Sequence, residues 1–259
     1  MIKLLFMGRK EVSANLLKKI YSYEGIDVVG VLTDSHLEGS PTKKVADELG
    51  LRTYVFDEAL SALKAGGLNF DLGLSVLYWR KLKEEFLTVP SKGVINFHPA
   101  LLPEYKGTGG YNLAILDGLS EWGVSAHYVD AGIDTGDIIK VNKFAIDEQR
   151  ETAASLERTS IAALESMVIE IFEKAISSDS ILESKSNIGG LYVSRIEMES
   201  MKKIIDGDNV SRKVRAFWFP PYDGAYLEVG GEKFTLVNRQ ILEELSPSGT
   251  TSLFAKNTG

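Results

Sequence analysis

The stretch Val94-Ile95-Asn96-Phe97-His98-Pro99 begins as a short apolar run and ends in polar residues and a proline. Similar runs, among them Ile26 to Leu32 and Leu72 to Leu77, alternate with segments whose apolar residues recur at helical spacing. This alternation predicts an α/β fold, a Rossmann-like and mostly parallel sheet with helices on both faces. Ligands of such sheets bind outside the carboxyl ends of the strands, and His98 lies at such an end.

The pattern changes after a long amphipathic helix that we predict from 151 to 175. Residues 177–186 are polar and rich in serine, which is typical of a linker. β-like segments follow at 190–196 and 214–219, and Gly230-Gly231 predicts a hairpin of 225–229 with 233–237. We therefore predict a domain over residues 1–176, a small β-rich carboxyl-terminal domain over 187–245 and a flexible tail over 246–259.

The composition of the 259 residues excludes several classes of protein. The 44% share of hydrophobic residues is that of a globular chain, and no apolar run approaches the roughly 18 residues of a membrane span. The chain has no cysteine, which excludes disulfides, thiolate metal sites and cysteine nucleophiles and fits a cytoplasmic protein. Its 29 basic and 36 acidic residues leave a net charge of −7, which argues against a protein that binds nucleic acid.

Asn96 and His98 are two residues apart in a predicted strand, so both side chains face the same side of the sheet. An amide can donate to a developing oxyanion, and an imidazole with a pKa near about 6.5 can move a proton. The pair therefore suits acyl-transfer chemistry, on a loop that Pro99 and Pro103 stiffen. The ordinary alternative is that His98 caps the strand and Asn96 satisfies a backbone group.

A second polar stretch runs from Ser125 to Asp137 and contains His127, Asp130 and Asp134. Two histidines and a carboxylate would be enough for a metal site. Asp and Gly at this spacing are also typical of tight turns, and the spacing of a calcium loop is not matched, so we predict no metal. A carboxylate that orients a histidine or relays its proton is the better interpretation.

Together the two stretches resemble the formyltransferase family that uses 10-formyltetrahydrofolate as its donor. The motif of that family is Asn-x-His followed by Leu-Leu-Pro, with a later Asp in an Asp-x-Gly loop. Here the corresponding residues are Asn96, His98, Leu101-Leu102-Pro103 and Asp134-Thr135-Gly136. The resemblance extends from residue 1 to about residue 176, and it implies an N-formyltransferase with the folate as its donor.

The resemblance also implies roles for individual residues. Asn96 would bind the oxyanion, His98 would take the proton of the amine or stabilise the oxyanion as imidazolium, and Asp134 would orient His98 or relay the proton through water. The pterin of the donor would lie against Tyr78, Trp79, Arg80, Leu82, Asp130 and Ile133, although Tyr78 and Trp79 taken alone suggest core packing. The acceptor would lie near Arg9, Lys106, Tyr111, His127, Arg215, Phe219 and Tyr222, and a core role for His127 is the alternative.

Members of the family act on glycinamide ribotide, on initiator methionyl-tRNA or on nucleotide-linked amino sugars. The tRNA enzymes have a larger carboxyl-terminal domain and a basic face, whereas this chain is acidic; the ribotide enzymes usually end after the α/β domain. Arg215-Ala216-Phe217 and Pro220-Pro221-Tyr222-Asp223-Gly224-Ala225-Tyr226 resemble the carboxyl-terminal region of the nucleotide-sugar enzymes. The resemblance therefore implies a dTDP- or UDP-linked amino-deoxy sugar as the acceptor.

Aromatic residues beside the rigid Pro220-Pro221 could stack on a base, and Arg215 or Lys106 could meet a diphosphate. Alternatively, residues 217–226 form the core of a small domain or a dimer seam. We expect a cytoplasmic homodimer that takes part in lipopolysaccharide or surface-glycan biosynthesis. Three other functions stay open: a methionyl-tRNA formyltransferase, a non-catalytic folate- or nucleotide-binding module, and a related hydrolase that releases formate.

Overall fold

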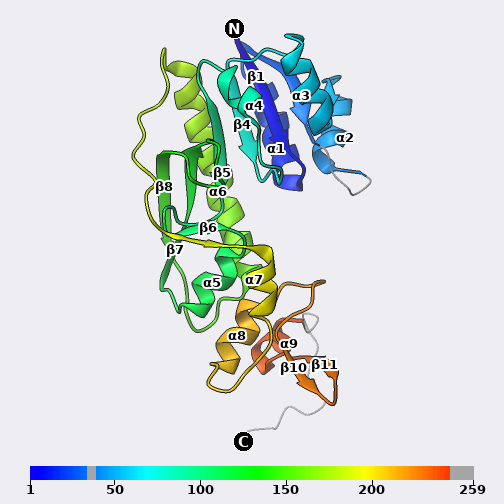
Figure 1. Cartoon of the computed structure of the whole chain (residues 1–259), viewed down its shortest axis with the longest axis vertical. Coiled ribbons are helices and arrows are strands. Elements are labelled where there is room, and N and C mark those ends of the chain that lie inside the picture. Colours follow the sequence, from blue (N-terminus) through cyan, green and yellow to red (C-terminus); the bar gives the residue numbers. More distant parts are fainter. Residues whose placement is uncertain (34–38, 246–259) are drawn as a thin grey trace, which may run out of the picture.

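A seven-stranded sheet in the order β3-β2-β1-β4-β5-β7-β8 forms the centre of the computed structural model, which describes residues 1–33 and 39–245 (Figure 1). The first five strands of this order are parallel, whereas β7 pairs antiparallel with β5 and β8 pairs antiparallel with β7. The predicted α/β fold with a mostly parallel sheet is therefore confirmed. The strands are β1 (Ile2–Gly8), β2 (Ile26–Leu32), β3 (Thr53–Tyr54), β4 (Leu72–Val76), β5 (Val94–His98), β7 (Glu121–Tyr128) and β8 (Ile138–Ala145).

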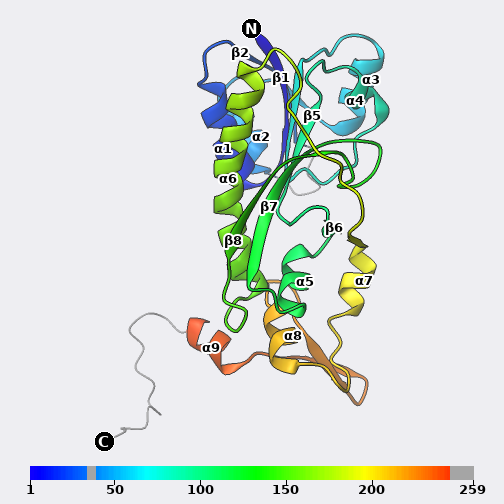
Figure 2. The ribbon, with the colours of Figure 1, turned by 90° about the vertical axis from the view of Figure 1, so that its left-hand side faces the viewer.

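Helices cover both faces of the sheet because successive side chains of a buried strand point to opposite faces. On β1, Leu4 and Phe6 pack in one apolar cluster with α1, α2 and α6, whereas Leu5 and Met7 pack in another with α3 and α4. Figure 2 shows the sheet between these two sets of helices. The helices are α1 (Glu11–Tyr21), α2 (Pro41–Glu48), α3 (Phe56–Lys64), α4 (Glu84–Thr88) and α6 (Ala153–Ser177).

The carboxyl-terminal third extends the molecule at one end of the sheet (Figure 1). Its apolar residues share a cluster with the end of the sheet and the beginning of α6, because Val214 and Phe217 pack with Trp122 and Leu156. The predicted hairpin across Gly230-Gly231 is confirmed. The elements here are β9 (Leu191–Val193), α7 (Arg195–Ser200), α8 (Val210–Ala216), β10 (Tyr226–Val229), β11 (Glu232–Thr235) and α9 (Arg239–Leu245). Between β5 and β7 lie the short strand β6 (Tyr105–Gly107) and the helix α5 (Gly110–Leu116).

The prediction of a β-like segment at 214–219 is wrong, because helix α8 occupies the first half of that segment. The Asn209 side chain caps this helix by accepting a hydrogen bond from the Arg212 N–H at 3.0 Å. The segment predicted at 190–196 forms only the short strand β9, since Ser194 and Glu197 form a capping box that begins α7. The domain boundaries stay predictions. The predicted tail over 246–259, and His36, lie outside the described residues.

Candidate active site

The main cavity of the molecule, about 440 Å³ in volume, opens where β4 and β5 end. Because β1 has β2 on one side and β4 on the other, the strand order reverses beside this point. Such reversals leave a crevice at the carboxyl ends of the strands, and the volume is in the range of small-molecule sites. The main cavity therefore lies at the end of β5, beside His98, where the sequence predicted a ligand to bind.

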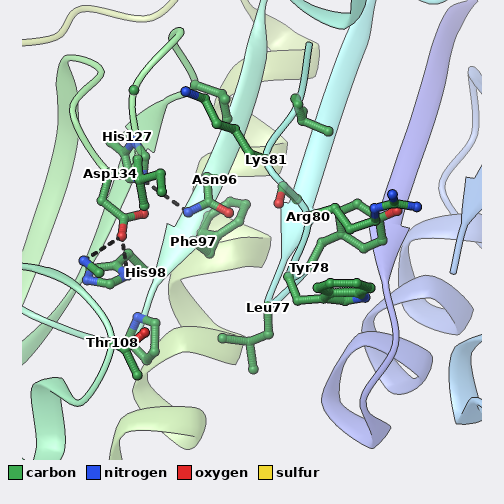
Figure 3. A pocket seen from close by; sticks show the side chains of 18 of the residues that line it. Leu77, Tyr78, Arg80, Lys81, Asn96, Phe97, His98, Thr108, His127 and Asp134 are labelled. Carbon is green, nitrogen blue, oxygen red and sulfur yellow. Dashed lines mark hydrogen bonds and ion pairs between the residues drawn. The ribbon is translucent and has the colours of Figure 1, made fainter. Parts of the chain in front are cut away.

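Asn96, His98 and Asp134 meet on one wall of the main cavity (Figure 3). Asn96 and His98 come from β5, and Asp134 comes from the loop between β7 and β8. His127 on β7 pairs directly opposite Asn96. The Asp134 carboxylate lies between two imidazoles, with Oδ2 3.6 Å from Nδ1 of His98 and Oδ1 3.5 Å from Nε2 of His127. The structure thus brings together the three residues predicted to be catalytic.

The tautomer of His98 follows from its neighbours. Its Nε2 lies 2.9 Å from the carbonyl oxygen of Tyr105, which can only accept, so Nε2 carries a proton. Burial lowers the pKa of His98, and the Asp134 carboxylate opposes that effect only in part. In its neutral form His98 therefore keeps Nδ1 unprotonated beside Asp134, where an added proton would be stabilised by the carboxylate.

Asp134 is ionised in this site although it is largely buried. Burial alone raises the pKa of its carboxyl, but the nearby His127 and His98 rings and the Gly107 N–H outweigh burial and bring the pKa to about 2. The Gly107 N–H donates to Oδ2 at 3.0 Å. The carboxylate is therefore a fixed negative charge at neutral pH, aimed at the two histidines.

His127 sets the orientation of the Asn96 amide. The Nδ1–H of His127 donates to the carbonyl of Tyr128 at 2.7 Å, so in the neutral ring Nε2 is an acceptor. Asn96 Nδ2 lies 3.0 Å from that nitrogen and donates to it. The contact of Nε2 with Asp134 Oδ1 is longer, at 3.5 Å. The second N–H of the amide is left for a ligand.

The loop that carries Asp134 is tightly shaped. Asp134 has a φ of 54° and Leu77, at the end of β4, has a φ of 53°; they are the non-glycine residues with positive φ in the described chain, and both line the main cavity. A side chain at Gly136 would come within 1.9 Å of the Tyr128 carbonyl, so the turn requires glycine there. Backbone strain of this kind, on the order of 1–3 kcal/mol per residue, persists where surrounding contacts enforce it.

The opposite wall of the main cavity is the one predicted to hold a pterin (Figure 3). Tyr78, Trp79, Arg80, Leu82 and Ile133 all line the cavity. The Arg80 guanidinium stacks over the Phe56 ring at 4.5 Å and lies 5.5 Å from the Trp79 ring. Tyr78 and Trp79 therefore give this wall aromatic side chains, which suit a planar ring system.

Asp130, predicted for the same wall, is placed differently. It is absent from the cavity lining, and its Oδ1 accepts hydrogen bonds from the Gly132 N–H and the Thr135 hydroxyl at 2.9 and 2.6 Å. The carboxylate of Asp130 thus shapes the loop that presents Asp134.

A second cavity of about 230 Å³ lies between α5, the beginning of α6 and the carboxyl-terminal third. Thr108 lines both cavities, so the two are neighbours. Burial and the nearby Glu157 raise the pKa of Tyr111, which is therefore a protonated hydrogen-bond donor. Of the residues predicted to bind the acceptor, Tyr111, Phe219 and Tyr222 line this second cavity. The charged residues that line it are Glu157, Arg195, Glu199, Lys202 and Asp223.

Three residues predicted to bind the acceptor line neither cavity. Lys106 is buried, and its Nζ donates to the carbonyls of Asn187 and Gly189 at 3.2 and 2.8 Å. Arg215 is only 3% exposed and donates to the carbonyl of Glu151 at 2.8 Å. Arg9 is half-buried, and the next residue, Lys10, lines the main cavity instead. Lys106 and Arg215 are thus buried, and both donate to backbone carbonyls of residues far away in the sequence.

Sequence reasoning missed Lys10 and Glu157. Lys10 lines the main cavity and Glu157 lines the second, and the two form an ion pair at 3.0 Å. The signal for Lys10 was its place directly after β1, where the chain leaves the carboxyl end of a strand. Glu157 lies inside a long helix and has no such signal.

Among residues 1–33 and 39–245, no group of three histidine or acidic side chains is arranged to hold a metal ion. Within the same residues no helix is both long and apolar enough to cross a membrane.

The lowered pKa of His98 predicts a pH dependence of stability. Below about pH 6.5 the unfolded chain binds a proton on His98 that the folded chain does not bind. The free energy of unfolding therefore falls as the pH falls toward the pKa of His98 in the folded chain. The slope is about 1.4 kcal/mol per pH unit for one such proton. We expect wild type to lose more free energy of unfolding than His98→Gln between about pH 7 and about pH 5 in chemical denaturation; parallel curves would contradict the prediction.

Known proteins share sequence and fold with this chain. The formyl transferase family model matches residues 23–171. A methionyl-tRNA formyltransferase of Caldanaerobacter subterraneus subsp. tengcongensis is 27% identical over 258 residues, covering 93% of this chain and 82% of that protein.

Two solved structures share the fold. A 4-N formyltransferase from Francisella tularensis has a TM-score of 0.78 at 19% identity, with 92% of this chain and 97% of that chain covered. The N-formyltransferase from Helicobacter canadensis, in complex with folinic acid and dTDP-3-aminofucose, has a TM-score of 0.72 at 24% identity, with 90% and 86% covered.

Proposed function

The chain belongs to the formyl transferase family, and we propose that it transfers a formyl group from 10-formyltetrahydrofolate to the amine of a nucleotide-linked amino-deoxy sugar. The observation that carries the chemistry is the meeting of Asn96, His98 and Asp134 on one wall of the main cavity. The observation that supports the acceptor is the aromatic and charged second cavity, which reaches the same wall through Thr108.

Attack of an amine on the formyl carbon produces a tetrahedral intermediate with a negative oxygen. The Asn96 amide keeps one N–H for this oxygen, because its other N–H is held by His127. The orientation is set before substrate binds, so the hydrogen bond forms without rearrangement as the charge develops. Asn96 is therefore our candidate for the oxyanion donor.

The amine attacks as the neutral base and must lose a proton during the reaction. The proton acceptor that we propose is the pair of His98 and Asp134. Both ring nitrogens of His98 already face protein groups, Nε2 the Tyr105 carbonyl and Nδ1 the carboxylate of Asp134. This arrangement favours delivery of the proton by way of Asp134 or a water beside it, after which the imidazolium stabilises the oxyanion. The proton would then pass to the donor nitrogen as its bond to the formyl carbon breaks, which releases tetrahydrofolate and the formylated amine.

The donor would lie along the aromatic wall. Tyr78, Trp79 and Ile133 face the space in front of Asn96 and His98 in the main cavity. A pterin on this wall would put its attached formyl group toward the polar wall that Figure 3 shows opposite. When bound, the folate supplies the formyl group that is transferred.

The second cavity supports a nucleotide as the handle of the acceptor. Phe219 and Tyr222 lie with ring centroids 6.0 Å apart at its edge, and aromatic faces of this kind stack on bases. Arg195 and Lys202 add positive charge for a diphosphate, although Glu199 forms an ion pair with Lys202. A sugar that reaches from this cavity past Thr108 would present its amine to Asn96 and His98.

The test is incubation of the enzyme and 10-formyltetrahydrofolate with dTDP- and UDP-linked amino sugars, read by mass spectrometry. We expect one of these sugars to be formylated and methionyl-tRNA to be left unchanged. Tyr222→Ala should raise KM for that sugar by roughly 5-fold to 100-fold at similar kcat, because stacking on a base contributes about 1–3 kcal/mol. Tyr21→Ala, which removes an exposed tyrosine of α1, is the matched control.

Methionyl-tRNA is the second candidate acceptor, and the identity to a methionyl-tRNA formyltransferase over most of the chain favours it. Formylation of methionyl-tRNA with no sugar turned over would overturn our acceptor while leaving the proposed chemistry intact. Release of formate without any acceptor would show a hydrolase instead.

A further inference from the structure

A segment that follows α6, here called the crossing segment (residues 185–193), runs from β8 to β6 (Figure 1). On the way it contacts the loop that carries Asp134. At one end, Lys185 exchanges two backbone hydrogen bonds with Ile138 at the start of β8. At the other end, β9 pairs in parallel with β6. A side chain at Gly190 would collide with the Pro103 carbonyl, so the segment is closely packed between its two attachments.

Asn187 lies between these attachments and holds the loop that carries Asp134. Its Nδ2 donates two hydrogen bonds, to the carbonyl of Asp134 and to the carbonyl of Gly136, each 2.9 Å long. The side chain is buried, with 7% of the residue exposed. One amide therefore holds both ends of the Asp134-Thr135-Gly136 turn from the side away from the cavity.

Lys106 holds Asn187 in turn. Its buried ammonium donates to the backbone carbonyls of Asn187 and Gly189. Lys106 precedes Gly107, whose N–H donates to the Asp134 carboxylate. The same strand β6 thus contacts the carboxylate of Asp134 directly and its backbone by way of Lys106 and Asn187.

We propose that Asn187 is a positioning residue that fixes the backbone of Asp134 for catalysis, and that Lys106 holds Asn187 in place. The inference rests on the proposed role of Asp134. It extends the active site beyond residues 23–171, where the family model matches, to a segment that joins the sheet to the carboxyl-terminal third.

The physical reason is the conformation of Asp134. An aspartate with a φ of 54° is held in a region that side chains rarely adopt, and the two hydrogen bonds from Asn187 supply part of what holds it there. Without them the loop can relax toward ordinary backbone angles and carry the carboxylate away from His98. A displacement of about 1 Å of a reacting group can cost roughly 100-fold in rate.

The kinetic test uses Asn187→Ala, which removes the amide, and Asn187→Asp, which keeps the shape but puts an acceptor against two carbonyls. We expect kcat to fall by about 10-fold to 100-fold in each, with KM for both substrates changed less than about 3-fold. Lys106→Met should lower kcat in the same direction by a smaller factor. Ile188→Ala, on the next residue and 82% exposed, is the matched control and should behave as wild type.

The second test does not depend on activity. The chain has three histidines, so imidazole NMR signals can be assigned with His36→Gln and His127→Gln and titrated. His98 is faced by Asp134, His127 and the Tyr105 carbonyl, and the carboxylate is what raises its pKa against burial. In Asn187→Ala the pKa of His98 should therefore be lower than in wild type.

An unchanged His98 titration in a folded Asn187→Ala protein would overturn the proposal. So would a loss of kcat that Ile188→Ala shares, because that loss would come from general destabilisation. If wild type formylates none of the acceptors, the proposed function fails, but the histidine titration still decides whether Asn187 positions Asp134.

Discussion

Replacing Asp134 by asparagine is expected to lower kcat by about 10³-fold to 10⁴-fold, the loss that a buried aspartate beside a catalytic histidine produces when its charge is removed. Asparagine has nearly the same shape, so the loop and the hydrogen bond from the Gly107 N–H can persist. The negative charge 3.6 Å from His98 Nδ1 is lost. Without that charge the protonated form of His98 loses the group that stabilises it, and neutral His98 carries no charge to stabilise an oxyanion.

The measurement is single-turnover formylation, which separates chemistry from product release. Asp137→Asn, three residues along the same loop and exposed, is the matched control and should keep wild-type kcat. In the Asp134 variant the pKa of His98 should also be lower, because the carboxylate no longer opposes burial. A variant that turns over within about 10-fold of wild type would rule out the proposed proton acceptor.

Replacing Asn96 by alanine should lower kcat by about 10²-fold to 10³-fold, or about 2.7–4 kcal/mol of transition-state stabilisation. The amide donates to His127 on one side and is left with a free N–H on the other. Alanine removes that donor and also leaves Nε2 of His127 without its partner. Binding of the donor should change little, since the aromatic wall that receives the pterin is untouched.

Donor affinity measured by fluorescence quenching, together with kcat, checks this split. Asn142→Ala on β8 is the control for loss of an asparagine from the same sheet. A loss of donor affinity with kcat unchanged would mean that Asn96 binds the ground state rather than the transition state, and our oxyanion assignment would be wrong.

Much of the fold was predictable because strands and helices here follow their apolar periods. The segment Ile26 to Leu32 forms a strand with the predicted bounds, and Ser40-Pro41 begins α2 as a cap and first residue should. The convergence of Asn96, His98 and Asp134 was predictable for a different reason. It was implied by the resemblance of the Asn-x-His and Asp-x-Gly motifs to those of the formyltransferase family, and in the structure the loop does bring Asp134 to His98 on β5.

What the sequence could not show were contacts between residues far apart along the chain. Lys106 and Arg215 are charged, and a local pattern assigns such side chains to solvent or to a ligand. In the fold they are buried because carbonyls of residues 187, 189 and 151 surround them. Helix α8 was missed because the helix has only seven residues, too few for the helical period of its apolar residues to be recognised.

The place of Thr108 on the walls of both cavities has a consequence for how turnover is organised. In the proposed function the donor binds in the main cavity and the acceptor in the second cavity, so neither has to depart before the other enters. A complex of three partners can then form, in which the one-carbon unit passes directly between them. No side chain has to carry it between two half-reactions, which agrees with a chain that contains no cysteine.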